Sequence, residues 1–199
     1  MTLRLDYLLL FLLATTLPLS AQDFGLRLAQ AAESQIGQTL LYDPSYQALA
    51  YPGGDVPPDR GVCSDVIIRA LRQQGIDLQV ALHQDMTLHF KKYPPLWNLA
   101  RPDRNIDHRR VPNLEYYFQR QGFSLPLSRN PGNFLPGDIV SVRLANQLPH
   151  IMIVSTQKNA NGQPLIVHNI GAGTRMEDSL FAFRMIGHYR IQAKLPRSP

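Results

Sequence analysis

Residues 59–75, DRGVCSDVIIRALRQQG, decide the fold of this chain. Apolar residues recur three and four positions apart after Cys63, and Gly75 follows them, so the stretch predicts an amphipathic helix that ends before Gly75. Turn-forming residues fill positions 51–60 just before it. Cys63 therefore lies in the first helical turn, where unpaired backbone N–H groups and the positive end of the helix dipole favour a thiolate.

Cys63 is also the only cysteine of the 199 residues. Exported proteins usually carry cysteines in pairs that form disulfides, so a single thiol indicates either a reactive group or a small buried apolar residue. The position at a helix start favours the first of these interpretations. We expect Cys63 to be a nucleophile.

The beginning of the chain has the pattern of an export signal. Arg4 precedes an apolar run at residues 8–17, and Ala21 offers a small residue for cleavage. The run is short for a membrane span, so residues 1–21 predict a signal peptide, a periplasmic protein and no stable membrane anchor after cleavage. Residues 22–199 then suffice for one domain with a sizeable core.

The formal net charge of +5 suits an acidic polymer such as the bacterial envelope. Basic residues cluster only around positions 101–110, where Asp103 and Asp107 accompany them, and no nucleic-acid motif is present. We expect no nucleic-acid partner.

Helical patterns fill the first half of the chain and strand patterns fill the second. The helices are expected near residues 24–38, 63–74, 78–93 and 112–122, and the strands near 139–144, 150–155, 165–169 and 186–191. This order predicts an α+β fold, in which N-terminal helices pack on a meandering antiparallel β-sheet. An inserted loop at residues 96–111 is long for a compact domain and is typical of a binding cleft.

Two histidines bracket one predicted hairpin, since His150 opens a strand and His168 ends the next. A two-residue turn at Asn161–Gly162 would place His168 opposite Ser155, on the other face from His150. A longer loop beginning near residue 157 would place both rings on one face. The sequence permits either register.

These features together resemble a known group of enzymes. A cysteine at a helix start, Pro136-Gly137-Asp138 before a strand, and the two histidines are similar to NlpC-type cell-wall cysteine peptidases, which are papain-like. The chain more closely resembles the bacterial family catalogued as domain of unknown function 1287. The stretches that carry this second resemblance are residues 59–66, 105–114, 136–140, 150–155, 168–173 and 187–190.

The resemblance implies a Cys-His-His triad, with Cys63 as nucleophile, His150 as base and His168 as its orienter, a role that Asn169 could take instead. It also implies that Tyr51 lies near the nucleophile and binds substrate, and we expect the same of Asp107, His108, Arg109 and Arg110. The peptidase superfamily usually has Asp and Gly where Val62 and Asp65 stand here. Asp65 could satisfy backbone N–H groups at the helix start and so offset the activation of the thiol.

The function that follows is a periplasmic cysteine amidase or peptidase acting on peptidoglycan stem peptides. The alternatives are a non-catalytic envelope-binding protein on a peptidase fold and a thiol acyltransferase. We expect a monomer without cofactor or metal, because the histidines lack the close spacing of ligand pairs.

Residues 105–110 form the remaining candidate site. Stem peptides carry carboxylates, and a guanidinium group binds a carboxylate with two parallel hydrogen bonds. We therefore expect Arg109 or Arg110 to reach the cleft beside Cys63 and to select an anionic substrate, while Asp107 or His108 fixes the loop.

Overall fold

The computed structural model describes residues 21–192, so the predicted signal peptide, apart from Ala21, lies outside the described residues. Within this range none of the helices is both long and apolar enough to cross a bilayer. The α-helices are α1 (Ala21–Glu33), α2 (Cys63–Gln73), α3 (Leu78–His89) and α4 (Val111–Arg120). The 3-10 helices are η1 (Phe90–Lys92), η2 (Asp107–Arg109) and η3 (Pro131–Asn133).

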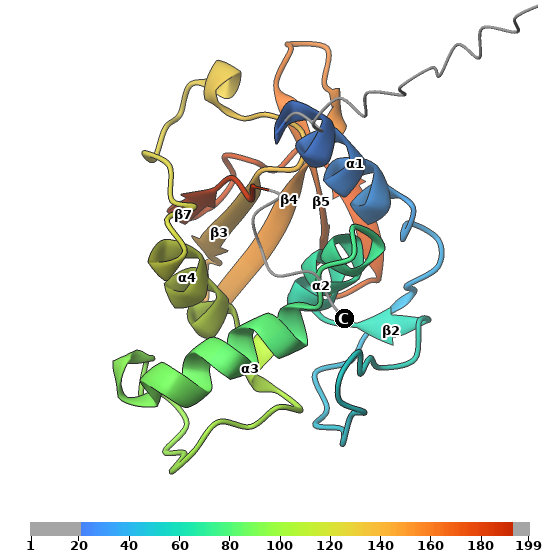
Figure 1. Ribbon diagram of the computed structural model, residues 1–199. Helices are drawn as coiled ribbons and strands as arrows, with labels where there is room; N and C mark the ends of the chain where they lie inside the picture. The colour runs from blue at the N-terminus through green and yellow to red at the C-terminus, as the bar shows by residue number, and fades with distance from the viewer. Residues whose placement is uncertain (1–20, 193–199) are drawn as a thin grey trace, which may run out of the picture.

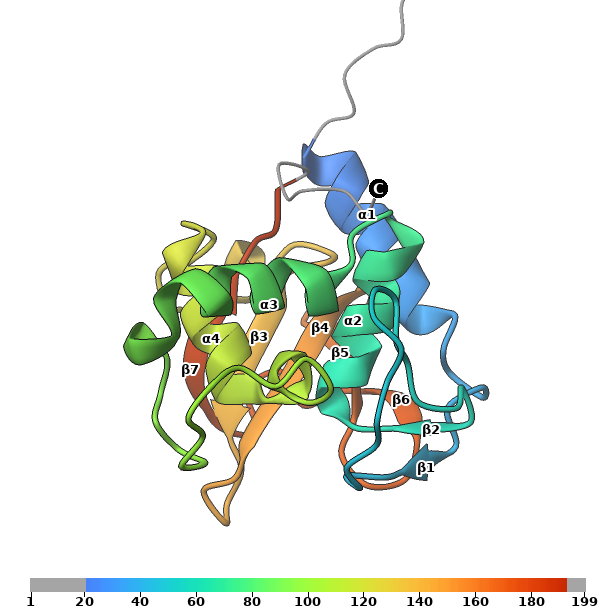
Figure 2. The same cartoon turned by 60° about the horizontal axis from the view of Figure 1, so that its bottom comes forward.

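Five strands form an antiparallel sheet in the order β6-β5-β4-β3-β7, and helices lie over one face of it (Figure 1). The strands are β3 (Ile139–Arg143), β4 (Pro149–Lys158), β5 (Pro164–Asn169), β6 (Thr174–Glu177) and β7 (Arg184–Tyr189). The α+β fold with helices packed on a meandering antiparallel sheet is thus confirmed. Turning the molecule shows α2 and α3 in front of the sheet (Figure 2).

The helix boundaries differ from the predicted ones where local signals compete. The first helix ends at Glu33, and turns fill the interval up to Gly37, which has a left-handed φ of 78°. The third helix begins as predicted because Asp77 caps it, accepting hydrogen bonds from the N–H groups of Gln79 at 3.0 Å and Val80 at 3.4 Å.

Alternation along the strands divides the core into two layers. Ile151 and Ile153 of β4 belong to the layer under the helices, together with Cys63. Met152 and Val154 belong to the layer on the opposite face. Both faces of the sheet are therefore covered, which explains why β4 is apolar at successive positions.

The β4–β5 register settles how the two histidines face. Ile153 pairs with Val167, and the same register carries His168 to the position opposite Met152. The two-residue turn at Asn161–Gly162 is wrong: the strands extend to the Lys158–Pro164 pair, and a β-bulge below that pair shifts the register. By this register His150 and His168 share one face, as the longer loop predicted.

A second, two-stranded sheet stands immediately before α2. Strand β1 (Leu41–Tyr42) pairs in parallel with β2 (Arg60–Gly61), with Tyr42 opposite Gly61. The side-chain amide of Asn169, at the end of β5, donates to the carbonyl oxygens of Leu41 at 3.2 Å and Gly61 at 3.0 Å. The segment that leads into α2 is therefore tied to the main sheet.

Candidate active site

Cys63 begins α2 and is only 5% exposed, with its sulfur against the start of β4. The backbone N–H of Ile151 hydrogen-bonds the thiol and favours its ionised form, as do nearby N–H groups at the helix start. Burial outweighs them and raises the pKa of the Cys63 thiol to about 11. The expected thiolate is thus corrected: in this environment the thiol is neutral at neutral pH.

Asp65 contributes to that result. Its Oδ2 accepts the Val62 N–H at 2.6 Å, so the carboxylate occupies the helix N-terminus that would otherwise serve the thiolate. Its negative charge also raises the pKa of Cys63. Gly61 permits this arrangement, because a Cβ at that position would lie 2.8 Å from Oδ2 of Asp65. Asp65 therefore opposes ionisation of the Cys63 thiol, as the sequence predicted.

Arg109 neutralises Asp65 inside the protein. Its Nε and Nη2 donate to the two carboxylate oxygens of Asp65, each at 2.9 Å, and both side chains are 3% exposed. The carbonyl oxygen of Arg109 also accepts the Ser64 hydroxyl at 2.7 Å. Helix η2 therefore docks on the first turn of α2, and the Arg109 guanidinium is already occupied.

The two histidines form a chain with a third residue that sequence reasoning missed. His150 Nε2 lies 2.8 Å from His168 Nδ1, and His168 Nε2 lies 3.1 Å from Oε2 of Glu177. Glu177 is on β6, and its side chain is 38% exposed. The glycines of the β5–β6 turn, Gly171 and Gly173, were the available signal that this strand folds back on His168.

The carboxylate at the end of this chain assigns the proton positions on the two rings. An ionised carboxylate only accepts, so Nε2 of His168 carries its proton and Nδ1 accepts from Nε2 of His150. The neutral His150 ring then bears its lone pair on Nδ1. Burial, followed by the neighbouring His168, lowers the pKa of His150 to about 3, and burial likewise lowers the pKa of His168 against the opposing effect of Glu177.

Cys63 contacts the backbone of the strand that carries His150, but among the described residues it does not contact the His150 side chain by a hydrogen bond. Within residues 21–192 the thiol makes no hydrogen bond to either His150 nitrogen, and its contact with β4 is the backbone N–H of the following residue, Ile151. By register His150 shares the face of Met152, whereas Ile151 faces α2. Asn169 faces the helices and bonds β1 and β2, so His168 is the residue that contacts His150.

Cys63 opens into a cleft of about 200 Å³. Tyr42, Trp97, Arg110 and Pro149 are among the residues that line it with the thiol. Tyr42 was not predicted; its phenol is near enough that Cys63 and Asp65 add to the burial that raises its pKa to about 12. The β1–β2 pairing brings Tyr42 to the cleft. Strands of two residues are too short to be recognised in the sequence.

Both predicted arginines line this cleft, but Arg109 makes four hydrogen bonds with its buried guanidinium, whereas Arg110 makes one. Its Nη1 binds Oδ1 of Asp107 at 3.0 Å, and its guanidinium carbon lies 4.1 Å from the centre of the Trp97 ring. Asp107 fixes the loop, as expected, since its carboxylate also accepts the Asp103 N–H at 2.5 Å.

Two predicted substrate residues lie elsewhere. Tyr51 does not line the cleft: its ring packs edge-on against His83 at 5.4 Å and under Arg104 at 5.6 Å. His108 is 2% exposed and packs in η2 toward α3, and burial lowers its pKa to about 4. Tyr51 was predicted from the resemblance and His108 from its place in the 105–110 loop, and the packing of the 51–60 turn and of η2 turns both side chains away from the cleft.

The remaining C-terminal histidine belongs to another cluster. His188 Nε2 lies 2.8 Å from Oδ2 of Asp138, which Arg190 also binds. Among residues 21–192, no three side chains of His, Cys, Asp or Glu converge in a way that could hold a metal ion.

Comparison with known proteins gives three matches. The family described as "Domain of unknown function (DUF1287)" matches residues 29–191. The uncharacterized protein YijF of Escherichia coli (strain K12) is 57% identical over 170 residues, which cover 85% of this chain and 83% of that protein. The structure of NlpC1 from Trichomonas vaginalis matches 86% of this chain with a TM-score of 0.46 and 15% identity, and this chain covers 45% of that one.

Proposed function

This chain belongs to the DUF1287 family, and from that membership and its site we propose that it is a periplasmic cysteine hydrolase that cleaves amide bonds in peptidoglycan stem peptides. One observation carries the proposal: the Glu177–His168–His150 chain leaves the lone pair of His150 on Nδ1, at the start of the strand that touches the Cys63 sulfur. A thiol and an oriented, neutral imidazole are the two groups that general-base activation requires, and both lie at the start of β4, although by register the His150 ring lies on the face of the sheet opposite Cys63.

In the proposed reaction Nδ1 of His150 removes the thiol proton as the Cys63 sulfur attacks the amide carbonyl. The backbone N–H of Cys63 helps to hold the oxyanion. Collapse of the tetrahedral intermediate breaks the C–N bond, and the His150 proton passes to the leaving amine. Water, deprotonated by the same ring, then releases the acid from the thioester. Glu177 and His168 stabilise the transient imidazolium.

His150 does not line the Cys63 cleft and by register lies on the other face of the sheet, so the proposed reaction requires the start of β4 to rearrange until Nδ1 of His150 reaches the thiol. Exclusion of water by the substrate does not itself ionise the thiol, so proton transfer has to accompany the attack. The proposed enzyme therefore works without a preformed thiolate–imidazolium pair.

Arg110 is the proposed contact for a substrate carboxylate. It lines the cleft with Cys63, keeps donors beyond its single bond to Asp107, and its guanidinium carbon lies 4.1 Å from the centre of the Trp97 ring. Arg110→Lys should weaken the use of anionic substrates, because an ammonium group cannot reproduce the planar fork.

A second function has one observation in its favour. The raised pKa of Cys63 is the property expected of a non-catalytic envelope-binding protein that keeps a peptidase fold. In that case Cys63→Ala would leave binding to the cell wall intact and would remove no product.

The deciding experiment incubates residues 22–199 with purified peptidoglycan and identifies the released fragments by mass spectrometry. Cys63→Ala and His150→Ala should release nothing, while His83→Ala, which alters a histidine outside the cleft, should behave as the wild type. The absence of any Cys63-dependent fragment would sink the hydrolase proposal. Cys63-dependent products on lipid instead of wall fragments would identify the protein as an acyltransferase.

A further inference from the structure

A larger cavity lies next to the Cys63 cleft, between α4 and β7. Its volume is about 510 Å³, against about 200 Å³ for the cleft. Sites for organic ligands usually measure roughly 300–1,000 Å³, so the cleft alone is small for a peptide. Any substrate longer than the group held beside Cys63 has to extend beyond the cleft.

The cavity and the cleft have one lining residue in common. Pro112, in the first turn of α4, lines both of them. Arg143 lines the cavity and is the cross-strand partner of Pro149, which lines the cleft. Glu115, one turn after Pro112 on α4, continues the wall. The cavity therefore adjoins the cleft at Pro112, and a substrate that extends past this residue would reach it.

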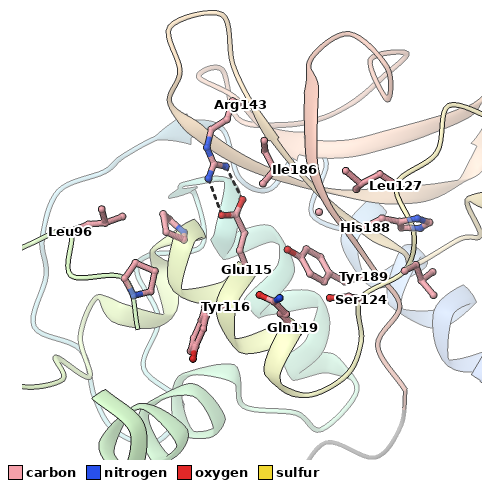
Figure 3. A pocket seen from close by; sticks show the side chains of 14 residues that line it. Leu96, Glu115, Tyr116, Gln119, Ser124, Leu127, Arg143, Ile186, His188 and Tyr189 are labelled. Atoms are coloured by element: carbon pink, nitrogen blue, oxygen red, sulfur yellow. Dashed lines mark hydrogen bonds and ion pairs between the residues drawn. The ribbon is translucent and has the colours of Figure 1, made fainter. Parts of the chain in front are cut away.

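A pair of opposite charges lies in this cavity (Figure 3). Arg143 Nη1 and Nη2 donate to the two carboxylate oxygens of Glu115 at 2.7 and 2.9 Å. The two side chains remain 21% and 13% exposed, so the pair is reachable from the cavity. Tyr189 and Ile186 of the β7 region stand across from α4 in the same view and provide apolar surface.

The donor and acceptor inventory shows what this pair can still bind. A guanidinium has five N–H donors, and Arg143 uses one toward Val142 in addition to those on Glu115, which leaves Nε–H and one Nη2–H. A carboxylate has about four acceptor positions, and Arg143 occupies two of those on Glu115. A carboxylate and an ammonium group can therefore add to the pair without breaking it.

We infer that this cavity binds the distal end of the substrate, and that this end carries an amino group and a carboxylate together, the first placed on Glu115 and the second on Arg143. A ligand with only one charge would leave the opposite member of the pair desolvated without a new partner, which is unfavourable. A zwitterionic end compensates both. This inference deepens the proposed function, since it rests on the same substrate occupying the Cys63 cleft.

The test measures binding separately from cleavage. Isothermal titration calorimetry with the Cys63→Ala protein compares a stem tripeptide ending in diaminopimelate, whose side chain is zwitterionic, with the same peptide N-acetylated or amidated on that side chain. We expect the unmodified peptide to bind at least tenfold more tightly. Glu115→Gln should abolish the discrimination against the acetylated peptide, and Arg143→Gln the discrimination against the amidated one.

A matched control is available on the same helix. Arg120 of α4 makes a two-bond ion pair with Asp85, at 3.0 and 3.1 Å, outside the cavity. Arg120→Gln, introduced in the same background, should keep the full preference, and thermal melting confirms that each variant is folded.

Equal affinity for the three peptides, or the same loss in Arg120→Gln, would overturn the inference. Cleavage by the wild-type protein without any preference for the zwitterion overturns the inference and leaves the hydrolase standing. Preference without cleavage supports the inference and removes the hydrolase.

Discussion

Alkylation of Cys63 by iodoacetamide should increase with pH in a single step with its midpoint near pH 11. Burial raises the pKa of the thiol to about 11, and burial together with His168 lowers the pKa of His150 to about 3. A proton moves spontaneously from the thiol to the imidazole only if these values stand in the opposite order. The resting protein should therefore show no inflection between about pH 5 and pH 9.

The magnitude follows from the displacement of the thiol pKa from its ordinary value of 9.0 to about 11. Each pKa unit is a factor of ten in thiolate, so the folded protein at pH 7 should contain about 100-fold less thiolate than the unfolded chain. The assay compares the rate for native protein with that for protein unfolded in guanidinium chloride, since both contain the same single thiol. Cys63→Ala provides the blank.

A rate that instead rises through a second step below about pH 7, and that loses this step in His150→Ala, would refute the reasoning. Such a step reports a thiolate paired with an imidazolium. Steric shielding of the thiol is a separate effect, because it lowers the rate equally at every pH and leaves the midpoint unchanged.

Three further changes test the neighbouring contacts. Arg109→Met leaves Asp65 buried without its partner and should lower the free energy of unfolding by about 3–5 kcal/mol in urea titrations; an unchanged midpoint would contradict a stabilising role. Glu177→Gln keeps an acceptor for His168 but removes the charge, so kcat on wall fragments should fall by roughly tenfold with little change in KM, whereas a rise in KM alone would indicate a substrate contact. Burial opposes ionisation of Asp138, but its bonds to Arg190 and His188 lower its pKa below the ordinary 3.8, so its contribution to stability is complete above that value and is lost as pH falls through the folded pKa. The melting temperature of Asp138→Asn should accordingly fall less at acid pH than that of the wild type. Parallel curves of melting temperature against pH for the two proteins would contradict this role of Asp138.

Local patterns sufficed to predict much of the fold. The apolar spacing after Cys63 identified α2, and the apolar stretches from His150 and before His168 identified two neighbouring strands. The β-bulge between Val154 and Lys158 was not foreseen, because a bulge depends on how two strands twist together and leaves little mark on either one.

The sequence predicted those residues of the candidate site that lie at the ends of helices and strands. Cys63 and the two histidines lie at element ends, and each was found from such a position. The Asp65–Arg109 pair joins residues 44 positions apart through packing of a 3-10 turn, so a loop arginine that looked free for substrate is in fact buried. Tyr42 is brought to the thiol by a pairing of two-residue strands, which is too short to produce a periodic signal.

The Asn169 amide has a consequence for the order in which the chain acquires its structure. It bonds the carbonyl groups of Leu41 and Gly61, which precede it by 128 and 108 residues. Contacts of this separation cost loop-closure entropy before they return any energy, and they slow folding. Helix α2 can form early from its own residues, but the segment that carries Tyr42, which also pairs with β2, gains this link to the main sheet only when β5 arrives. The thiol therefore stays open to solvent, and to oxidants, until nearly the whole chain has folded.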